Sequence, residues 1–233
     1  YHAIRLVNEM NRKTKIIATV GPSVHSKDKI HQLIDSGVDV IRLNFSHGTY
    51  EDHKNVVEWV REYPKPIAIM QDIQGPKIRT GISEPNTVLV SGDFVDLTNI
   101  ENTSSDKSIF INYDNLFTDI KEGERVFIDD GQVVMRVTEI NEKKITASIE
   151  IGGELRDNQG VAFPDSQLSV SSITPKDKDD LSYGEEIGVD LVAVSFVRKA
   201  SDISEVKALV KKDIKIIAKI ELKEGMKNLD SII

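Results

Sequence analysis

A lysine and a glutamate stand two residues apart near the end of a predicted strand, at Lys219 and Glu221. In an extended segment, residues two apart share a face, so the ammonium and the carboxylate project to the same side. A carboxylate suits Mg²⁺, and an ammonium neutralises the charge that develops on a phosphoryl group during its transfer. The pair is therefore typical of a site for Mg²⁺-dependent phosphoryl transfer. A structural Lys–Glu ion pair at the mouth of a barrel is an equally open interpretation.

The same spacing recurs in the segment Val40–Gly48, where Arg42, Asn44 and Ser46 alternate with apolar residues. An arginine in such a segment is unfavourable unless an anion is held against it. That anion is either a bound ligand or a protein carboxylate, and Asp72 is the candidate carboxylate. The segment therefore indicates a strand whose carboxyl end builds a polar site.

Each of the five predicted strands has polar residues at or just after its carboxyl end. Because active sites of parallel βα folds form at the carboxyl ends of the strands, these residues are expected to meet at one edge. They are Thr19, Arg42, Asn44, Ser46, His47, Asp72, Lys77, Arg79, Ser195, Arg198, Lys219 and Glu221. His47, in a Ser-His-Gly turn, is interpreted as a turn or rim residue in preference to a proton-transfer group.

The composition is that of a globular protein with room for one large domain or two moderate ones. Its 233 residues are 39% hydrophobic and 29% charged, as in ordinary folded chains. The formal charge of −8 argues against a broad surface for nucleic acid or anionic membranes. No apolar run reaches the ~20 residues of a membrane helix. Cysteine is absent, which excludes disulfides and fits a cytoplasmic protein.

Two kinds of periodicity predict the elements that must position these residues. Strands and helices alternate in both flanking parts of the chain, which indicates a parallel sheet with helices over its outer face. The predicted strands cover 16–20, 40–44, 67–72, 191–196 and 215–221, and the predicted helices cover 27–36, 50–62, 175–187 and 201–212. Between these parts, short β-type runs separated by turn residues indicate an all-β domain. These runs cover 87–90, 94–98, 108–111, 125–129, 132–138 and 144–151.

Together these patterns predict an α/β fold in which a βα barrel is interrupted after its third strand. Residues 1–79 form the first part of the barrel domain, residues 80–165 form the inserted β domain, and residues 166–233 form the second part of the barrel domain.

Five segments are long and distinctive motifs. They begin at Lys15, Ile41, Asp72, Val194 and Ile216, and they read KIIATVGPS, IRLNFSHG, DIQGPKIRTG, VSFVRKASD and IIAKIELKEG. In this order they resemble the pyruvate kinase family, and the resemblance extends over essentially all of the chain. It implies a (β/α)₈ TIM-type barrel with a small all-β barrel domain inserted after strand three. It also implies the glycolytic transfer of a phosphoryl group from phosphoenolpyruvate to ADP, giving pyruvate and ATP.

The resemblance implies roles for the motif residues. Arg42 is expected to grip the phosphate of phosphoenolpyruvate, Lys219 to stabilise the phosphoryl group in transfer, and Ser195 to contact the substrate. Glu221 is expected to bind Mg²⁺ or Mn²⁺. The implied nucleotide-binding residues are Asn44, Ser46, His47 and Arg79, and the implied monovalent-cation pocket consists of Asn44, Ser46, Asp72 and the Ile73 carbonyl. The inserted domain is expected to act as a lid, and the family implies a homo-oligomer, a tetramer, with no nucleic-acid or membrane partner.

Two positions depart from the family pattern. Family members that need K⁺ carry a glutamate where this chain has Lys77. The Lys77 ammonium is therefore expected to supply the positive charge, so that K⁺ is not required. Gln159 replaces a lid-domain lysine that helps to hold the ADP phosphates, which leaves the nucleotide affinity open.

The end of the sequence at Ile233 follows the fifth predicted strand and precedes the family's second Mg²⁺-binding aspartate. Five strands do not close this barrel. The expectation is that the chain belongs to a longer protein or is completed by another chain, and that it shows little or no turnover alone. Two alternatives stay open: a non-catalytic binding module, and a Mg²⁺-dependent aldolase or lyase barrel, which would lack the inserted domain.

Overall fold

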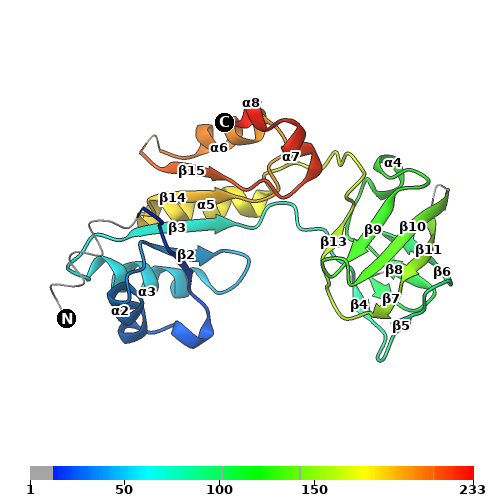
Figure 1. The fold of residues 1–233 in the computed structure, drawn as a ribbon, viewed down its shortest axis with the longest axis horizontal. Coiled ribbons are helices and arrows are strands. Elements are labelled where there is room, and N and C mark those ends of the chain that lie inside the picture. Colours follow the sequence, from blue (N-terminus) through cyan, green and yellow to red (C-terminus); the bar gives the residue numbers. More distant parts are fainter. Residues whose placement is uncertain (1–12, 101, 142, 212) are drawn as a thin grey trace. The chain divides into compact units, whose positions relative to one another are not determined.

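The structure, a computed structural model, describes residues 13–100, 102–141, 143–211 and 213–233 (Figure 1). The chain divides into two compact units, each with its own hydrophobic core. The first unit contains the chain up to Gly75 together with 172–221 and 228–233, and the second contains 76–171 and 222–227. Residues 1–12, with which the predicted barrel domain begins, and Lys212, the predicted end of a helix, lie outside the described residues.

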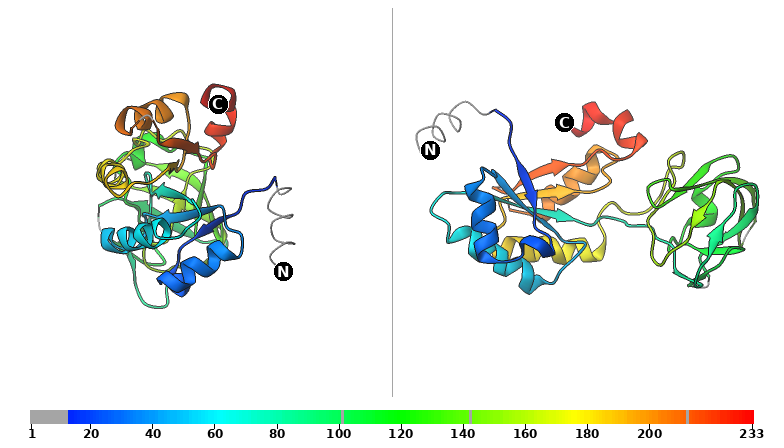
Figure 2. Two further views of the ribbon diagram at one scale, coloured as in Figure 1. Left: turned by 90° about the vertical axis from the view of Figure 1, so that its left-hand side faces the viewer. Right: turned by 60° about the horizontal axis from the view of Figure 1, so that its bottom comes forward.

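The first unit is built on a sheet of five parallel strands in the order β1-β2-β3-β14-β15. These strands are β1 (Ile17–Thr19), β2 (Val40–Asn44), β3 (Ala68–Ile73), β14 (Leu191–Val194) and β15 (Lys215–Ala218). The helices are η1 (Pro22–Val24), α2 (Lys27–Asp35), α3 (Tyr50–Arg61), α5 (Pro175–Ile187), α6 (Ala200–Leu209) and α8 (Leu229–Ile232). The left view of Figure 2 shows the sheet curved, with the long helices along its outer side. The predicted parallel α/β arrangement is confirmed.

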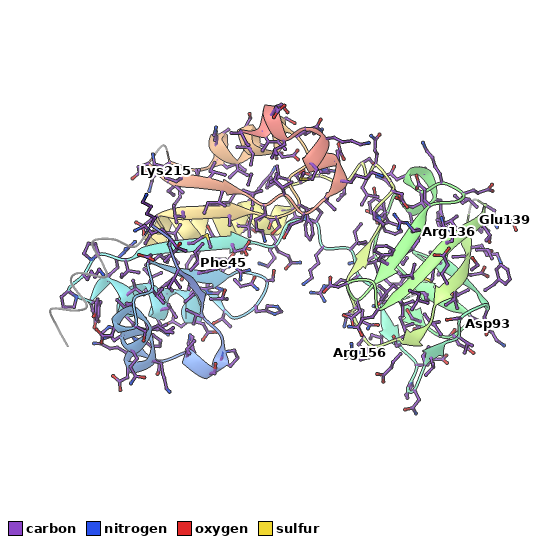
Figure 3. The ribbon with its side chains drawn as sticks, in the orientation of Figure 1. Phe45, Asp93, Arg136, Glu139, Arg156 and Lys215 are labelled. Carbon is purple, nitrogen blue, oxygen red and sulfur yellow. The ribbon has the colours of Figure 1, made fainter. Side chains whose placement is uncertain are left out.

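Alternate residues of β2 show how the sequence divides between the core and the site. Ile41 and Leu43 are buried in the core against the helices, and so is Phe45, which is labelled in Figure 3 just after the strand ends. Arg42 and Asn44, between them, are only partly buried. Since successive strand residues point to opposite faces, the core residues fix the direction of Arg42 and Asn44 toward the open face.

Two helices begin at capping boxes. Thr49 accepts a hydrogen bond from the Asp52 N–H, and the Asp52 carboxylate accepts one from the Thr49 N–H, at the start of α3. The same reciprocal pair joins Thr174 and Asp177 at the start of α5. Such a pair satisfies backbone donors that an uncapped helix leaves unpaired, so it fixes where the chain turns after the polar strand ends.

The second unit is mainly β-structure. A six-stranded sheet has the order β13-β9-β10-β11-β6-β8, and all of its pairs are antiparallel except β6 with β8. Its strands are β6 (Phe94–Thr98), β8 (Ser108–Phe110), β9 (Arg125–Ile128), β10 (Val133–Ile140), β11 (Ile145–Ile151) and β13 (Val161–Ala162). The shorter elements are β4 (Ile82–Ser83), β5 (Val88–Leu89), β7 (Thr103–Ser104), β12 (Gly153–Glu154), α4 (Leu116–Asp119) and α7 (Lys223–Lys227). All six predicted β-runs contain strands.

Within the described residues of both units, no helix has the length and apolar character needed to cross a membrane.

A close contact between α5 and β3 gives a stability prediction. Gln71 is fully buried, and its Nε2 donates a hydrogen bond to the Asp180 carbonyl at 2.6 Å. A Cβ atom at Gly184 would lie 2.7 Å from Gln71 Cδ, so alanine would force Gln71 out of this hydrogen bond. We expect Gly184→Ala to lower the free energy of unfolding by about 1–3 kcal/mol. In an unobstructed helix the same change is stabilising by roughly 0.5–1 kcal/mol.

Urea denaturation measures this effect, and Gln71→Ala provides the matched background. In the Gln71→Ala background, the Gln71 side-chain atoms that a Cβ atom at residue 184 would overlap are absent. Adding Gly184→Ala to this background should therefore no longer destabilise the protein. Equal losses in both backgrounds would show that Gln71 is not the cause.

Candidate active site

Asp72, near the carboxyl end of β3, is the buried anion at the centre of the candidate site. Its side chain is 3% exposed. Oδ2 accepts hydrogen bonds from Arg42 Nε, at 2.7 Å, and from Arg42 Nη2. Lys219 Nζ lies 2.9 Å from the other oxygen, Oδ1. One carboxylate thus holds a guanidinium from β2 and an ammonium from the residue that follows β15.

Arg42 is held from both sides. Besides its bonds to Asp72, its Nη1 donates to Thr19 Oγ1 on β1 at 2.7 Å. The interpretation of Asp72 as the carboxylate that faces Arg42 is therefore confirmed. About a third of the Arg42 side chain is still exposed, so the guanidinium keeps a surface on which a bound anion can rest.

Glu221 extends the cluster by one carboxylate. Its Oε1 lies 3.7 Å from Lys219 Nζ, and its Oε2 accepts a hydrogen bond from the Phe196 N–H at 2.9 Å. The side chain is 39% exposed. The Lys219–Glu221 ion pair is therefore present, and it lies in the same cluster as Arg42 and Asp72.

Ser195 and Ile73 lie at the ends of two paired strands. Ser195 is buried, and its Oγ donates to the Ile73 carbonyl at 2.6 Å, which ties the end of β14 to the end of β3.

Asn44 Oδ1 accepts a hydrogen bond from the Ser46 N–H at 3.1 Å. Among the described residues, Asp72 Oδ1 has no hydrogen-bond donor. The Lys219 ammonium lies at ion-pair distance from that buried oxygen.

A cavity of about 730 Å³ lies beside these residues in the first unit. Its wall includes Pro22, His25, Asn44, His47 and Asp52. Pockets for small molecules have volumes of roughly 300–1,000 Å³. The cavity is therefore large enough for a small-molecule ligand, and it is lined by two of the residues that the sequence assigns to nucleotide binding.

His53, on the same wall, gives a pH prediction. It is buried and stacks on Phe45 with 4.1 Å between ring centroids. Burial lowers the pKa of His53 below its ordinary value, and a hydrogen bond to the His47 backbone opposes this in part. Below a pH of about 6.5 the unfolded chain therefore takes up this proton more readily than the folded chain.

We expect the free energy of unfolding to be highest above that pH and to fall as the pH is lowered from 7.5 to 5. Urea denaturation at several pH values measures how steeply the free energy of unfolding changes with pH. His53→Phe should remove the part of this pH dependence that is due to His53. An identical slope in the variant would show that His53 does not contribute.

Lys77, Arg79 and Gln159 lie in the second unit. Arg79 Nη1 donates to the Asn158 carbonyl at 2.6 Å. Burial lowers the pKa of Lys77, and the nearby charge of Arg79 lowers it further. Gln159 is buried, and its Oε1 accepts the Arg156 N–H at 2.8 Å. The Gln159 side chain is therefore hydrogen-bonded to the backbone of its own unit.

Comparison with known proteins identifies the family. A family model described as pyruvate kinase, barrel domain, matches residues 11–233. The chain belongs to the pyruvate kinase family. It is 39% identical to pyruvate kinase 2 of Synechocystis sp. over 234 residues and 39% identical to the pyruvate kinase of Bacillus licheniformis over 233 residues. It is 37% identical to the pyruvate kinase of Corynebacterium efficiens over 232 residues.

These matches cover 95–96% of this chain, but the chain spans only 40–49% of the length of these relatives. The family membership therefore applies to the chain as a whole, whereas each relative is more than twice as long as its matched part.

The donor set fits a Mg²⁺ ion of the kind that a pyruvate kinase would use. The described residues contain no group of three or more histidine, cysteine, aspartate or glutamate side chains able to cage a metal. Glu221 instead offers one part-exposed carboxylate. Mg²⁺ is usually bound through one or two carboxylates together with water and substrate phosphates, and Glu221 fits that pattern.

The sequence analysis missed a second polar cluster, at the start of α5. Lys176 Nζ donates to the Phe45 carbonyl at 3.0 Å and to the fully buried Asp180 carboxylate at 2.5 Å. Tyr50 also donates to Asp180, and burial together with Asp180 raises the pKa of Tyr50 to about 12. The spacing of Lys176 and Asp180, four residues apart, was the available signal. This cluster fixes the turn that carries Phe45 and the residues after it.

Proposed function

We propose that the chain carries the phosphoenolpyruvate site of a pyruvate kinase, which transfers a phosphoryl group to ADP in a Mg²⁺-dependent reaction. The observation that supports this most strongly is that Arg42 and Lys219 both contact Asp72, while Glu221 pairs with Lys219. Two cations and a metal-binding carboxylate at one edge of a parallel sheet form the arrangement that phosphoryl transfer needs. Family membership supports the same assignment.

The reaction would depend on positioning and charge more than on covalent help from the protein. Arg42 would hold the phosphate of phosphoenolpyruvate with the exposed part of its guanidinium. Lys219 would neutralise the charge that develops on the phosphoryl group as it moves. Glu221 would hold Mg²⁺, which when bound neutralises phosphoryl oxygens. Asp72 would keep the two protein cations at a fixed separation, and Ser195 would contact the substrate near the end of β14.

The nucleotide would bind beside this cluster. Asn44 and His47 lie on the wall of the cavity of about 730 Å³, which supports a role for this wall in holding ADP. Ser46 is bonded to Asn44 through its N–H and belongs to the same turn. Arg79 is proposed as a nucleotide contact on the strength of its sequence motif.

The curved sheet of the first unit would be part of a (β/α)₈ barrel. β1 and β15 are its outer strands, and in the described part of the chain each is paired on one side only. Residues 80–165 would form the domain inserted after strand three. A homo-oligomer, a tetramer as in the family, and a cytoplasmic location, which the absence of cysteine favours, belong to the same proposal.

Lys77 would make the enzyme independent of K⁺. The pocket proposed for a monovalent cation contains the Asp72 carboxylate, Asn44, Ser46 and the Ile73 carbonyl, and a lysine in the adjoining motif brings one positive charge of its own. We expect the rate to change by less than about twofold when K⁺ is replaced by tetramethylammonium, and Lys77→Glu to make K⁺ stimulate the rate about tenfold or more. A steady-state assay in Na⁺-free buffer measures both. Strong K⁺ stimulation of the unaltered protein would contradict the proposal.

The activity itself is tested with the purified protein expressed from its whole reading frame. A lactate dehydrogenase-coupled assay with phosphoenolpyruvate, ADP and Mg²⁺ should show pyruvate formation that requires all three. Absence of pyruvate under these conditions would refute the proposed function. Pyruvate formation that does not need ADP and that releases inorganic phosphate would indicate hydrolysis of phosphoenolpyruvate instead of transfer to ADP.

A further inference from the structure

Phe196 has a backbone conformation that bulky residues rarely adopt. Its φ angle is +55°, in the left-handed region where a Cβ atom is crowded by the backbone. Four other described non-glycine residues have positive φ, and all four are asparagine or aspartate. Those residue types tolerate the left-handed region, whereas phenylalanine does not. Such a conformation persists only where the surroundings enforce it, and it is common at functional sites.

The conformation directs two successive N–H groups toward the end of β15. The Phe196 N–H donates to Glu221 Oε2 at 2.9 Å, and the Val197 N–H donates to the Lys219 carbonyl at 3.3 Å. Successive residues of an extended strand point in opposite directions, so an extended Phe196 would not reach both. A left-handed residue instead turns the chain, and both of these N–H groups then reach the segment that follows β15. The turn after β14 is therefore hydrogen-bonded to both residues of the Lys219–Glu221 pair.

The turn that contains Phe196 also packs against a neighbouring loop. A Cβ atom at Gly75 would lie 3.2 Å from Phe196 Cδ2 and 3.2 Å from Ser195 Cβ, so the turn packs directly against Gly75. Gly75 has a φ angle of +67°, and its N–H donates to Oδ1 of the fully buried Asp177 at 3.0 Å. Gly75 is thus anchored to the start of α5. The Phe196 side chain thus lies against this anchored loop, and its N–H bonds Glu221.

We propose that Phe196 is a positioning residue for Glu221. Its N–H holds Oε2, so Oε1, which lies 3.7 Å from Lys219 Nζ, is the oxygen that stays available to a metal ion. The Glu221 side chain is 39% exposed, and without this hydrogen bond it would sample several rotamers. The inference rests on the proposed function, in which Glu221 is the Mg²⁺ ligand. It adds that the left-handed backbone of Phe196 sets the metal affinity without any contact between Phe196 and the metal.

The test compares two variants of similar size that differ in their tolerance of positive φ. Phe196→Val places a β-branched residue where the left-handed conformation is strongly disfavoured, and Phe196→Asn places a residue that accepts it. Both remove the ring. Binding of Mn²⁺ alone, followed by the electron paramagnetic resonance signal of free Mn²⁺, gives a readout that does not depend on turnover.

We expect Phe196→Val to weaken Mn²⁺ binding about tenfold or more, as the loss of an outer-shell partner does, and Phe196→Asn to stay within about threefold of the unaltered protein. If Phe196→Val does not fold, Phe196→Ala and Phe196→Gly replace the pair, because only alanine resists positive φ. Equal Mn²⁺ affinity within the pair that is used would overturn the positioning role.

Glu221→Gln separates this inference from the proposed function. If Glu221→Gln abolishes Mn²⁺ binding while the Phe196 variants keep it, Glu221 is the ligand and the positioning role of Phe196 is wrong. If Glu221→Gln binds Mn²⁺ as well as the unaltered protein, the metal assignment of the proposed function is wrong, and the inference about Phe196 fails with it.

Discussion

Replacing Lys219 by methionine is expected to lower kcat by about 10³-fold or more, since a preorganised cation opposite a transferring phosphoryl group contributes an effect of that size. The structure places the Lys219 ammonium 2.9 Å from Asp72 Oδ1 and 3.7 Å from Glu221 Oε1. Methionine has a similar length and no charge. It leaves the space filled and removes the charge, so the loss should appear in kcat more than in the KM for ADP.

The coupled assay for pyruvate measures this effect, with Lys178→Met as the matched control. Lys178 forms an exposed ion pair with Glu205 at 3.7 Å, so its loss should leave kcat within about twofold. A Lys219→Met enzyme that keeps even a tenth of the original kcat would exclude Lys219 from the transfer step.

The second large effect is expected for Asp72→Asn. This change removes the buried anion between Arg42 and Lys219, so Arg42 loses the carboxylate that it contacts and Lys219 keeps only the more distant carboxylate of Glu221, at 3.7 Å. Removing one partner of a buried ion pair costs about 3–5 kcal/mol. Because both cations are roughly 30% exposed, we expect the free energy of unfolding to fall by about 3 kcal/mol, at the low end of that range.

Urea denaturation measures the loss, and Glu62→Gln is its control. Glu62 pairs with Lys27, and about half of each side chain is exposed. Such a surface pair contributes little to stability. If Asp72→Asn were no more destabilising than Glu62→Gln, Asp72 would not be holding the two cations together.

Much of the first unit follows from local patterns in the sequence. The predicted strand 40–44 and the predicted helix 175–187 have the bounds observed for β2 and α5. The alternation around Arg42 predicted correctly which residues enter the core. Of the residues predicted to meet at one edge, Arg42, Asp72, Lys219 and Glu221 are joined by contacts. The placement of Lys77 and Arg79, which belong to the second unit, at the same edge stays a prediction. The proposed roles of these residues in catalysis stay a prediction.

The differences between the predicted and the observed elements come from contacts between distant parts of the chain. The predicted strand 191–196 ends at Val194 because Ser195 bonds to the Ile73 carbonyl and Phe196 turns into the left-handed region. No local pattern marks a phenylalanine for that conformation. The two-residue strands β4, β7 and β12, which were not predicted, depend on pairing across the second unit, and their sequences carry too few residues for a period to be recognised.

Buried polar contacts also could not be predicted from single segments of the sequence. Gln71 stands in an apolar strand, and only the packing of Gly184 against it shows why the helix has a glycine there. Asp177 is both a helix cap and the acceptor for the Gly75 N–H. The sequence signals the first role through the Thr174 spacing, whereas the second depends on a partner 102 residues away.

If Arg42, Lys219 and Glu221 surround a single metal-bound phosphate, bound Mn²⁺ lies close to the phosphorus of phosphoenolpyruvate, and that distance can be measured. Paramagnetic relaxation of the ³¹P signal should be strongly enhanced when Mn²⁺ and phosphoenolpyruvate bind the unaltered protein together. In Glu221→Gln the enhancement should disappear, and in Arg42→Met it should fall because the phosphate is no longer held. Full enhancement in both variants would contradict the claim, since the metal and the phosphate would then meet somewhere else.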